Sequence, residues 1–226
     1  MDIVTIFILV SSLLLEILIT VFYFLTKHKF KGQGAILFYT AYTFISVVIL
    51  NLLINRYSGT EYLSFRVFTI VECLTLILYL RLILSSKTAK TALIFISIGF
   101  VAFSIWGLIT NRNEDTFDSI PTVIECLIII GFSMFYFYEQ LKNPQSLFLY
   151  STPNFWIVVG LIIFFAGNFF VFIYAQSNSE SIEFKNTFGL INAILSFIEN
   201  ILFLIAFIIA RQQSKTIKSN IVAKTT

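Results

Sequence analysis

Seven long apolar stretches follow one another along the chain, separated by short segments of charged or turn-forming residues. A bilayer core of about 30 Å needs about 20 mostly apolar residues in a helix. Only helices or closed barrels satisfy their backbone in lipid, and barrel strands alternate over about 10 residues, unlike these stretches. We therefore expect an all-α, polytopic membrane helix bundle with seven transmembrane helices, at residues 3–25, 35–54, 62–84, 92–109, 117–138, 155–175 and 188–210.

The composition agrees with a chain solvated mainly by lipid. Of its 226 residues, 58% are hydrophobic and 12% are charged, whereas an average soluble domain has about 25% charged residues. This balance excludes a water-soluble enzyme or a free nucleic-acid-binding domain, so the expected partner of most of the surface is the lipid bilayer. The first stretch lacks a basic start and exceeds the 7–15 apolar residues of a signal peptide, so we interpret it as a retained helix.

The distribution of basic residues predicts the orientation. Lysine and arginine are enriched in the short cytoplasmic loops of membrane proteins. With seven alternating spans, one side receives ten basic residues and the other receives three, namely Arg56, Arg112 and Lys185. The sequence therefore predicts an N-terminus outside and a cytoplasmic C-terminus, with residues 1–210 as a single transmembrane domain and residues 211–226 as a basic cytoplasmic tail.

Four glutamates lie within predicted spans, all of them in odd-numbered helices: Glu16, Glu72, Glu125 and Glu199. A carboxylate at the bilayer centre costs about 2.5–3.5 kcal/mol on insertion scales. These side chains must therefore face the interior of the bundle, be protonated, or pair with other groups. Ionisable residues inside a membrane are candidates for a functional site.

The surroundings of these glutamates repeat. Thr69 to Leu74 read Thr-Ile-Val-Glu-Cys-Leu, and Thr122 to Leu127 read Thr-Val-Ile-Glu-Cys-Leu. Residues three apart share one face of a helix, so each hydroxyl points the same way as its glutamate, and Asn192, Ser196 and Glu199 continue the pattern in the last helix. One interpretation is a polar pocket that binds a ligand or ion; the other is interhelical hydrogen bonding that fixes the packing. The predicted pocket comprises Glu16, Glu72, Glu125, Glu199, Thr69, Thr122, Ser196 and Asn192.

Catalysis has little support in the sequence. A metal-dependent enzyme needs clusters of His, Asp or Glu, and His28 is the only histidine. There is no Gly-x-Ser-x-Gly or phosphate-binding glycine motif, and the last span has no lysine for a retinal Schiff base. We expect no enzyme, no catalytic residue, no metal site and no cofactor.

Two functions remain open. The first is a sensor or partner module that binds a small ligand or ion and acts through a cytoplasmic or membrane partner protein. The second is a proton- or cation-linked small-molecule transporter built from two three-helix units, spans one to three and five to seven. Transporters are often built with helices broken by Gly or Pro near midplane, and the only proline near a span is Pro121, so the first interpretation is preferred.

One segment carries a resemblance. Pro153 to Gly160 read Pro-Asn-Phe-Trp-Ile-Val-Val-Gly, and Gly167 to Phe170 read Gly-Asn-Phe-Phe. This segment, about a tenth of the chain, resembles one in uncharacterised seven-helix membrane proteins of Bacteroidota. The resemblance implies seven helices and a multi-pass protein of a bacterial inner (cytoplasmic) membrane, and it carries no activity.

Overall fold

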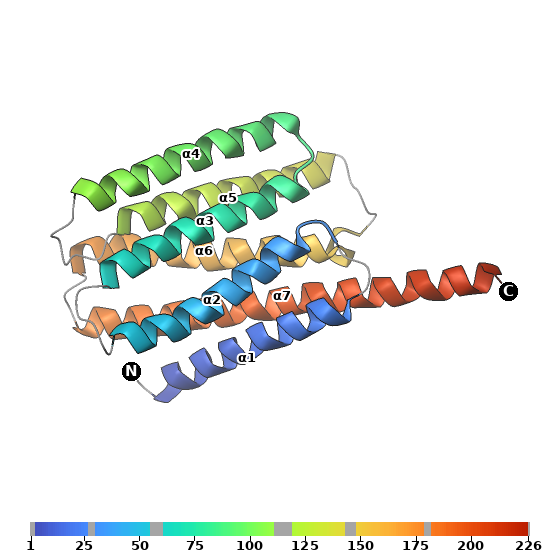
Figure 1. The fold of residues 1–226 in the computed structure, drawn as a ribbon, viewed down its shortest axis with the longest axis horizontal. Helices are drawn as coiled ribbons and strands as arrows, with labels where there is room; N and C mark the ends of the chain where they lie inside the picture. Colours follow the sequence, from blue (N-terminus) through green and yellow to red (C-terminus); the bar gives the residue numbers. More distant parts are fainter. Residues whose placement is uncertain are drawn as a thin grey trace.

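The fold is entirely helical over the part of the chain that the structure describes. The computed structural model describes residues 3–26, 30–54, 61–110, 119–142, 148–178 and 182–225, at some helix ends by backbone alone. The helices are α1 (Ile3–Leu25), α2 (Gln33–Ile54), α3 (Glu61–Ile83), α4 (Lys87–Thr110), α5 (Ser119–Lys142), a short 3-10 helix η1 (Leu149–Ser151), α6 (Pro153–Asn178) and α7 (Ile182–Thr225) (Figure 1). The prediction of an all-α chain is confirmed.

Five of the described helices are long and apolar enough to cross a membrane: α1, α4, α5, α6 and α7. This makes the chain a membrane-embedded helical bundle. Of the other two predicted spans, α3 carries four charged residues, Glu61, Arg66, Glu72 and Arg81, which lower its hydropathy. In α2, the side chains from residue 48 onward lie outside the described part of the chain.

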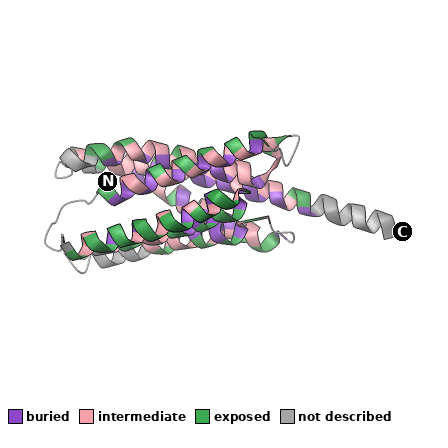
Figure 2. Ribbon diagram, turned by 90° about the horizontal axis from the view of Figure 1, so that it is seen from above, coloured by how far each residue is buried: buried purple, intermediate pink, exposed green. Residues whose placement is uncertain are grey.

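Six helices form a closed ring. In order around it, α1 packs on α2, α2 on α3, α3 on α5, α5 on α6, α6 on α7, and α7 returns to α1. The remaining helix, α4, packs on the outside against α3 and α5 (Figure 1). Residues coloured as exposed lie mainly along the outward faces of the helices, as Figure 2 shows. The ring therefore has an interior to which α4 does not contribute.

A tightly packed apolar core fills the end of the ring opposite the N-terminus. It is formed by the C-terminal half of α3, the middle of α5 and of α7 and the N-terminal halves of α2 and α6, and the buried cluster also includes Ile19 of α1 and Leu93 of α4. Its fully buried members include Ile36, Leu76, Leu80, Ile129, Leu161, Phe203 and Phe207. We call this group the apolar core. It differs from the other half of the ring, which holds several buried polar side chains and contains a cavity.

Two polar contacts close the same end of the bundle. The Glu139 carboxylate of α5 accepts hydrogen bonds of 2.7 Å from both the Ser85 and the Ser86 backbone N–H groups, just before α4 begins. A carboxylate at the start of a helix satisfies free N–H groups and interacts well with the helix dipole.

Gly32, which precedes α2, has φ +81° and lies against the Tyr79 ring, where a Cβ atom would come within 2.6 Å. Only glycine fits this position.

The last helix is much longer than its predicted span. The sequence predicts a helix at residues 188–210 followed by a tail, but α7 runs for 44 residues without interruption, about 66 Å at 1.5 Å per residue. Its C-terminal part extends beyond the bundle (Figure 1). Where it leaves, the Gln213 amide donates a 2.8 Å hydrogen bond to the Ser151 carbonyl of η1, and the Arg211 guanidinium lies 5.4 Å from the centre of the Phe22 ring.

The close packing of α6 on α7 leads to a first prediction. A Cβ atom on Gly167 would lie 2.6 Å from the Leu195 side chain, whereas a Cβ atom on Gly131 of α5 would meet nothing within 4 Å. Overpacking a well-filled interface costs about 1–3 kcal/mol. We expect Gly167→Val to lower the Tm of the purified protein by about 2–12 °C and Gly131→Val to leave it within about 2 °C. Equal Tm values for the two variants would show that this interface is loose.

Candidate functional site

The ring encloses a cavity of about 280 Å³ in the half nearer the N-terminus. Side chains from α1, α2, α3, α5, α6 and α7 line it, and no described side chain of α4 does. Its polar groups gather at mid-depth, directly above the apolar core. Toward the N-terminal end of the ring its walls are apolar, with Leu9, Leu13, Val47, Phe65, Phe172 and Phe188. We call the polar end of the cavity, next to the apolar core, its floor. The walls between this floor and the N-terminal end of the ring are largely apolar.

Seven of the eight residues in the predicted pocket line this cavity: Glu16, Glu72, Glu199, Thr69, Thr122, Ser196 and Asn192. Glu16, Glu72 and Glu199 are buried, at no more than 8% exposure. Glu125 is fully buried but does not line the cavity; the next residue on α5, Cys126, takes a place in the wall. The Thr69 hydroxyl donates to the Phe65 carbonyl of its own helix. It does not bond to a glutamate.

Tyr39 of α2 joins two of the glutamates. Its hydroxyl lies 3.1 Å from Oε1 of Glu72 on α3, and 3.3 Å from Oε2 of Glu199 on α7. A tyrosine hydroxyl has one proton to donate but can also accept a hydrogen bond. The three groups can therefore bond together when one carboxyl group is protonated and donates to the Tyr39 oxygen. We call Tyr39, Glu72 and Glu199 the carboxyl bridge.

Glu16 of α1 belongs to a second, neighbouring group. Its Oε1 atom accepts hydrogen bonds from the Asn200 amide at 3.3 Å and from the Thr43 hydroxyl at 3.4 Å. The same amide donates to the Ser12 hydroxyl at 2.9 Å. Because Thr43 lies four residues after Tyr39, one face of α2 serves both groups and connects them across the cavity floor.

Several buried polar atoms in this region have no hydrogen-bond partner among the described residues. They are Oε2 of Glu16, the hydroxyl of Thr122, both amide atoms of Asn168 and both carboxyl oxygens of Glu125. Of these residues, Glu16, Thr122 and Asn168 line the cavity, and each is at least nine-tenths buried. Buried polar groups in proteins are nearly always hydrogen-bonded. Unpaired donors and acceptors that face a cavity are therefore suited to a bound ligand or bound water.

The contribution of α2 was not predicted from the sequence. Tyr39 and Thr43 lie in an even-numbered helix, and a tyrosine in an apolar stretch is hard to distinguish from an interfacial one. A signal was present, because Tyr39 and Thr43 lie four residues apart and so share one helix face. Asn200, directly after Glu199 in the sequence, was also left out of the predicted pocket. Together these three side chains hold the glutamates in place.

Among the residues that the structure describes, no group of three or more His, Cys, Asp or Glu side chains is arranged to hold a metal ion. Cys73 and Cys126 are buried free thiols. The chemistry available at the cavity is thus that of carboxyl, hydroxyl and amide groups next to aromatic rings. No protein-family model, no curated protein sequence and no solved structure matches this chain.

Proposed function

We propose that this chain is a seven-helix protein of a bacterial inner membrane that binds a small ligand or ion in its cavity and transmits occupancy to a partner protein. The observation that carries the proposal is the cavity itself. It lies within an apolar bundle, its floor holds three buried carboxyl groups, and Glu16, Thr122 and Asn168 present unpaired polar atoms. Small-molecule sites are typically apolar clefts with a few convergent polar groups.

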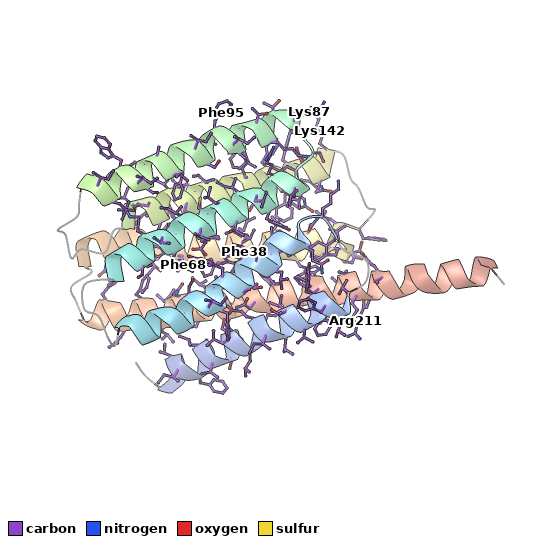
Figure 3. All side chains as sticks on the ribbon, in the orientation of Figure 1. Phe38, Phe68, Lys87, Phe95, Lys142 and Arg211 are labelled. Carbon is purple, nitrogen blue, oxygen red and sulfur yellow. The ribbon has the colours of Figure 1, made fainter. Side chains whose placement is uncertain are left out.

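The proposed orientation places the N-terminus outside. In support, Lys87 at the start of α4, Lys142 at the end of α5 and Arg211 of α7 all lie toward the same end of the bundle (Figure 3), although they are far apart in the sequence. Basic residues favour the cytoplasmic side of a membrane. With that end cytoplasmic, the cavity lies in the outer half of the membrane, and the apolar core lies between its floor and the cytoplasm.

Reporter fusions test this orientation. A reporter that is active only in the cytoplasm is expected to be active when it is fused after Lys31, Lys90 or Lys218 and inactive when it is fused after Arg112, because the proposed topology places the first three positions inside and Arg112 outside. A reporter that is active only outside the cytoplasm, such as alkaline phosphatase, should give the opposite pattern. A cytoplasmic signal after Arg112 would overturn the proposed topology.

The course of α7 supports transmission of a signal to a partner. Asn192, Ser196 and Glu199 line the cavity, and the same uninterrupted helix continues to Thr225. The Gln213–Ser151 hydrogen bond connects this helix to the segment between α5 and α6. A shift of α7 on ligand binding would therefore reach both its own C-terminal extension and that segment. We propose these two elements as the partner contact.

A carrier is the second candidate function, and the order of helices around the ring supports it. The units α1–α2–α3 and α5–α6–α7 occupy the two halves of the ring, with α4 outside. A rotation of the ring by 180° about its central axis would place α1 on α5, α2 on α6 and α3 on α7. Each helix would then have equivalent neighbours, as parallel repeats require. Transport would, however, require the apolar core to open. We propose no enzymatic activity for either candidate.

A binding and flux experiment distinguishes the two. The purified protein is screened by thermal shift against a library of small amines, alcohols, carboxylates and alkali-metal salts. We expect at least one class to raise the Tm saturably, and Glu72→Gln to abolish that shift, while Glu139→Gln retains it. The active compound is then tested for flux in sealed proteoliposomes. Binding without flux supports the sensor, and flux abolished by Glu72→Gln supports the carrier. A library without a saturable hit would contradict both.

A further inference from the structure

We propose that the ligand is a small organic ammonium ion with an apolar body, bound with its charged nitrogen at the carboxyl bridge. This inference rests on the proposed ligand-binding function and adds to it the chemical class of the ligand. Three features of the cavity support it: the charge of the floor, the nature of the walls and the polar atoms left unpaired there.

The described residues that line the cavity include acids but no basic side chain. Three carboxyl groups contribute to its wall, and none of its described lining residues is a lysine, arginine or histidine. The buried arginine of α3, Arg66, is directed to α4, where it donates a 2.9 Å hydrogen bond to the Ser104 carbonyl. In a site of low dielectric constant, attraction between opposite charges is much stronger than in water. The floor therefore favours a cation over an anion or a neutral molecule.

The walls match an organic cation better than a bare ion. Six phenylalanines line the cavity: Phe65, Phe68, Phe164, Phe165, Phe172 and Phe188. Phe172 lies between two of the others, with ring centres 6.3 Å from Phe65 and 5.4 Å from Phe188. Aromatic faces attract ammonium groups within about 6 Å and also pack well on apolar groups. A ligand with an ammonium group and an apolar body can therefore contact the floor through its charge and the walls through its apolar part.

The hydrogen-bonding groups also fit an ammonium ion. An ammonium has up to three donors and no acceptor. The Tyr39 hydroxyl lies between two carboxyl groups, at 3.1 and 3.3 Å, and without a ligand one of these groups must be protonated for all three to bond together. A bound cation that neutralises one carboxylate takes the place of that proton. The unpaired Oε2 of Glu16 offers another acceptor on the same floor. A calcium ion, by comparison, takes six to eight oxygen ligands, and no described cluster of acidic, histidine or cysteine residues is arranged to hold a metal.

Three probes of similar shape test the charge requirement: 2-phenylethylammonium, 2-phenylethanol and 3-phenylpropanoate, each titrated into the wild-type protein and followed by thermal shift. Sodium chloride serves as a fourth arm at matched ionic strength. We expect saturable stabilisation by the ammonium ion alone. Stabilisation of equal size by the alcohol, the carboxylate or sodium would overturn the inference while leaving ligand binding in the cavity in place.

Variants locate the site. Glu72→Gln and Glu199→Gln are each expected to weaken binding of 2-phenylethylammonium by about 10-fold or more, as for a hydrogen bond to a charged group. Glu139→Gln, outside the cavity, should leave the affinity unchanged. Phe172→Leu should weaken binding by about threefold or more, because the apolar body of the ligand loses an aromatic partner in the cavity wall, whereas Phe170→Leu, 71% exposed on the same helix, should not. Unchanged affinity in both glutamate variants would overturn the inference even if the ammonium ion binds.

Discussion

Tyr39→Phe is expected to be among the most disruptive single-atom deletions in this protein. Tyr39 is 3% exposed, and its hydroxyl is the group that joins Glu72 to Glu199. Without it, two buried carboxyl groups lose their common partner, and each unsatisfied group costs about 1–3 kcal/mol. We expect the Tm to fall by about 5–15 °C, measured by thermal unfolding of the purified protein.

Two further variants make this prediction specific. Tyr138→Phe removes the same atom from an exposed tyrosine of α5 and should leave the Tm unchanged. Glu72→Gln in the Tyr39→Phe background removes one of the stranded carboxyl groups, so the double variant should lose less stability than the sum of the single ones, as expected for groups in one hydrogen-bonded network. If Tyr39→Phe were as stable as Tyr138→Phe, the carboxyl bridge would not hold the helices together.

Phe203→Ala is expected to cause the second large loss of stability. Phe203 is fully buried in the apolar core. Its ring meets the Tyr39 ring edge-on at 6.1 Å and lies where a Cβ atom on Gly160 would come within 3.1 Å. Removing a buried phenylalanine side chain costs about 3–5 kcal/mol. We expect the Tm to fall by about 6–20 °C, because the floor of the cavity loses its support.

The controls for this prediction use the same residue type. Phe203→Leu keeps most of the volume and should cost less than about 1.5 kcal/mol. Phe170→Ala lies on the outer face of α6, where the side chain is 71% exposed, and should have little effect in detergent. A Phe203→Ala protein as stable as Phe170→Ala would mean that the apolar core is not closely packed beneath the carboxyl bridge.

The helices were predictable because each apolar stretch is long enough to span a bilayer as a helix, and α1 begins and ends where its predicted span does. Their ends were less predictable where tertiary contacts determine them. The sequence predicts a span from residue 92, but α4 begins at Lys87, since the Glu139 carboxylate from another helix binds the preceding N–H groups. The order of helices around the ring could not be predicted, because helices that are apolar on all sides carry little information about which face is inside.

The candidate site was predictable to the extent that burying a charge is costly. A glutamate within a span must face the interior, and this cost alone identified Glu16, Glu72 and Glu199. The same argument also identified Glu125, but this side chain does not line the cavity. The cost of burying a charge indicates that a side chain faces the interior of the bundle, but it does not indicate which part of that interior the side chain reaches. Tyr39 was not predicted because burying a tyrosine costs little free energy, and the sequence does not show that its hydroxyl lies between two carboxyl groups. The phenylalanines of the wall are indistinguishable in sequence from those that face lipid.

Thiol accessibility tests most directly the central claim, a ligand cavity in the half of the ring nearer the N-terminus, next to the apolar core. In a Cys73→Ala, Cys126→Ala background, Ser196→Cys places a thiol in the cavity wall, and Ala206→Cys places one in the fully buried core. We expect a membrane-impermeant methanethiosulfonate reagent, applied to the side that carries the N-terminus, to label Ser196→Cys at a rate that 2-phenylethylammonium reduces, and to leave Ala206→Cys unlabelled. Labelling of both positions at equal rates, or of neither, would contradict the account.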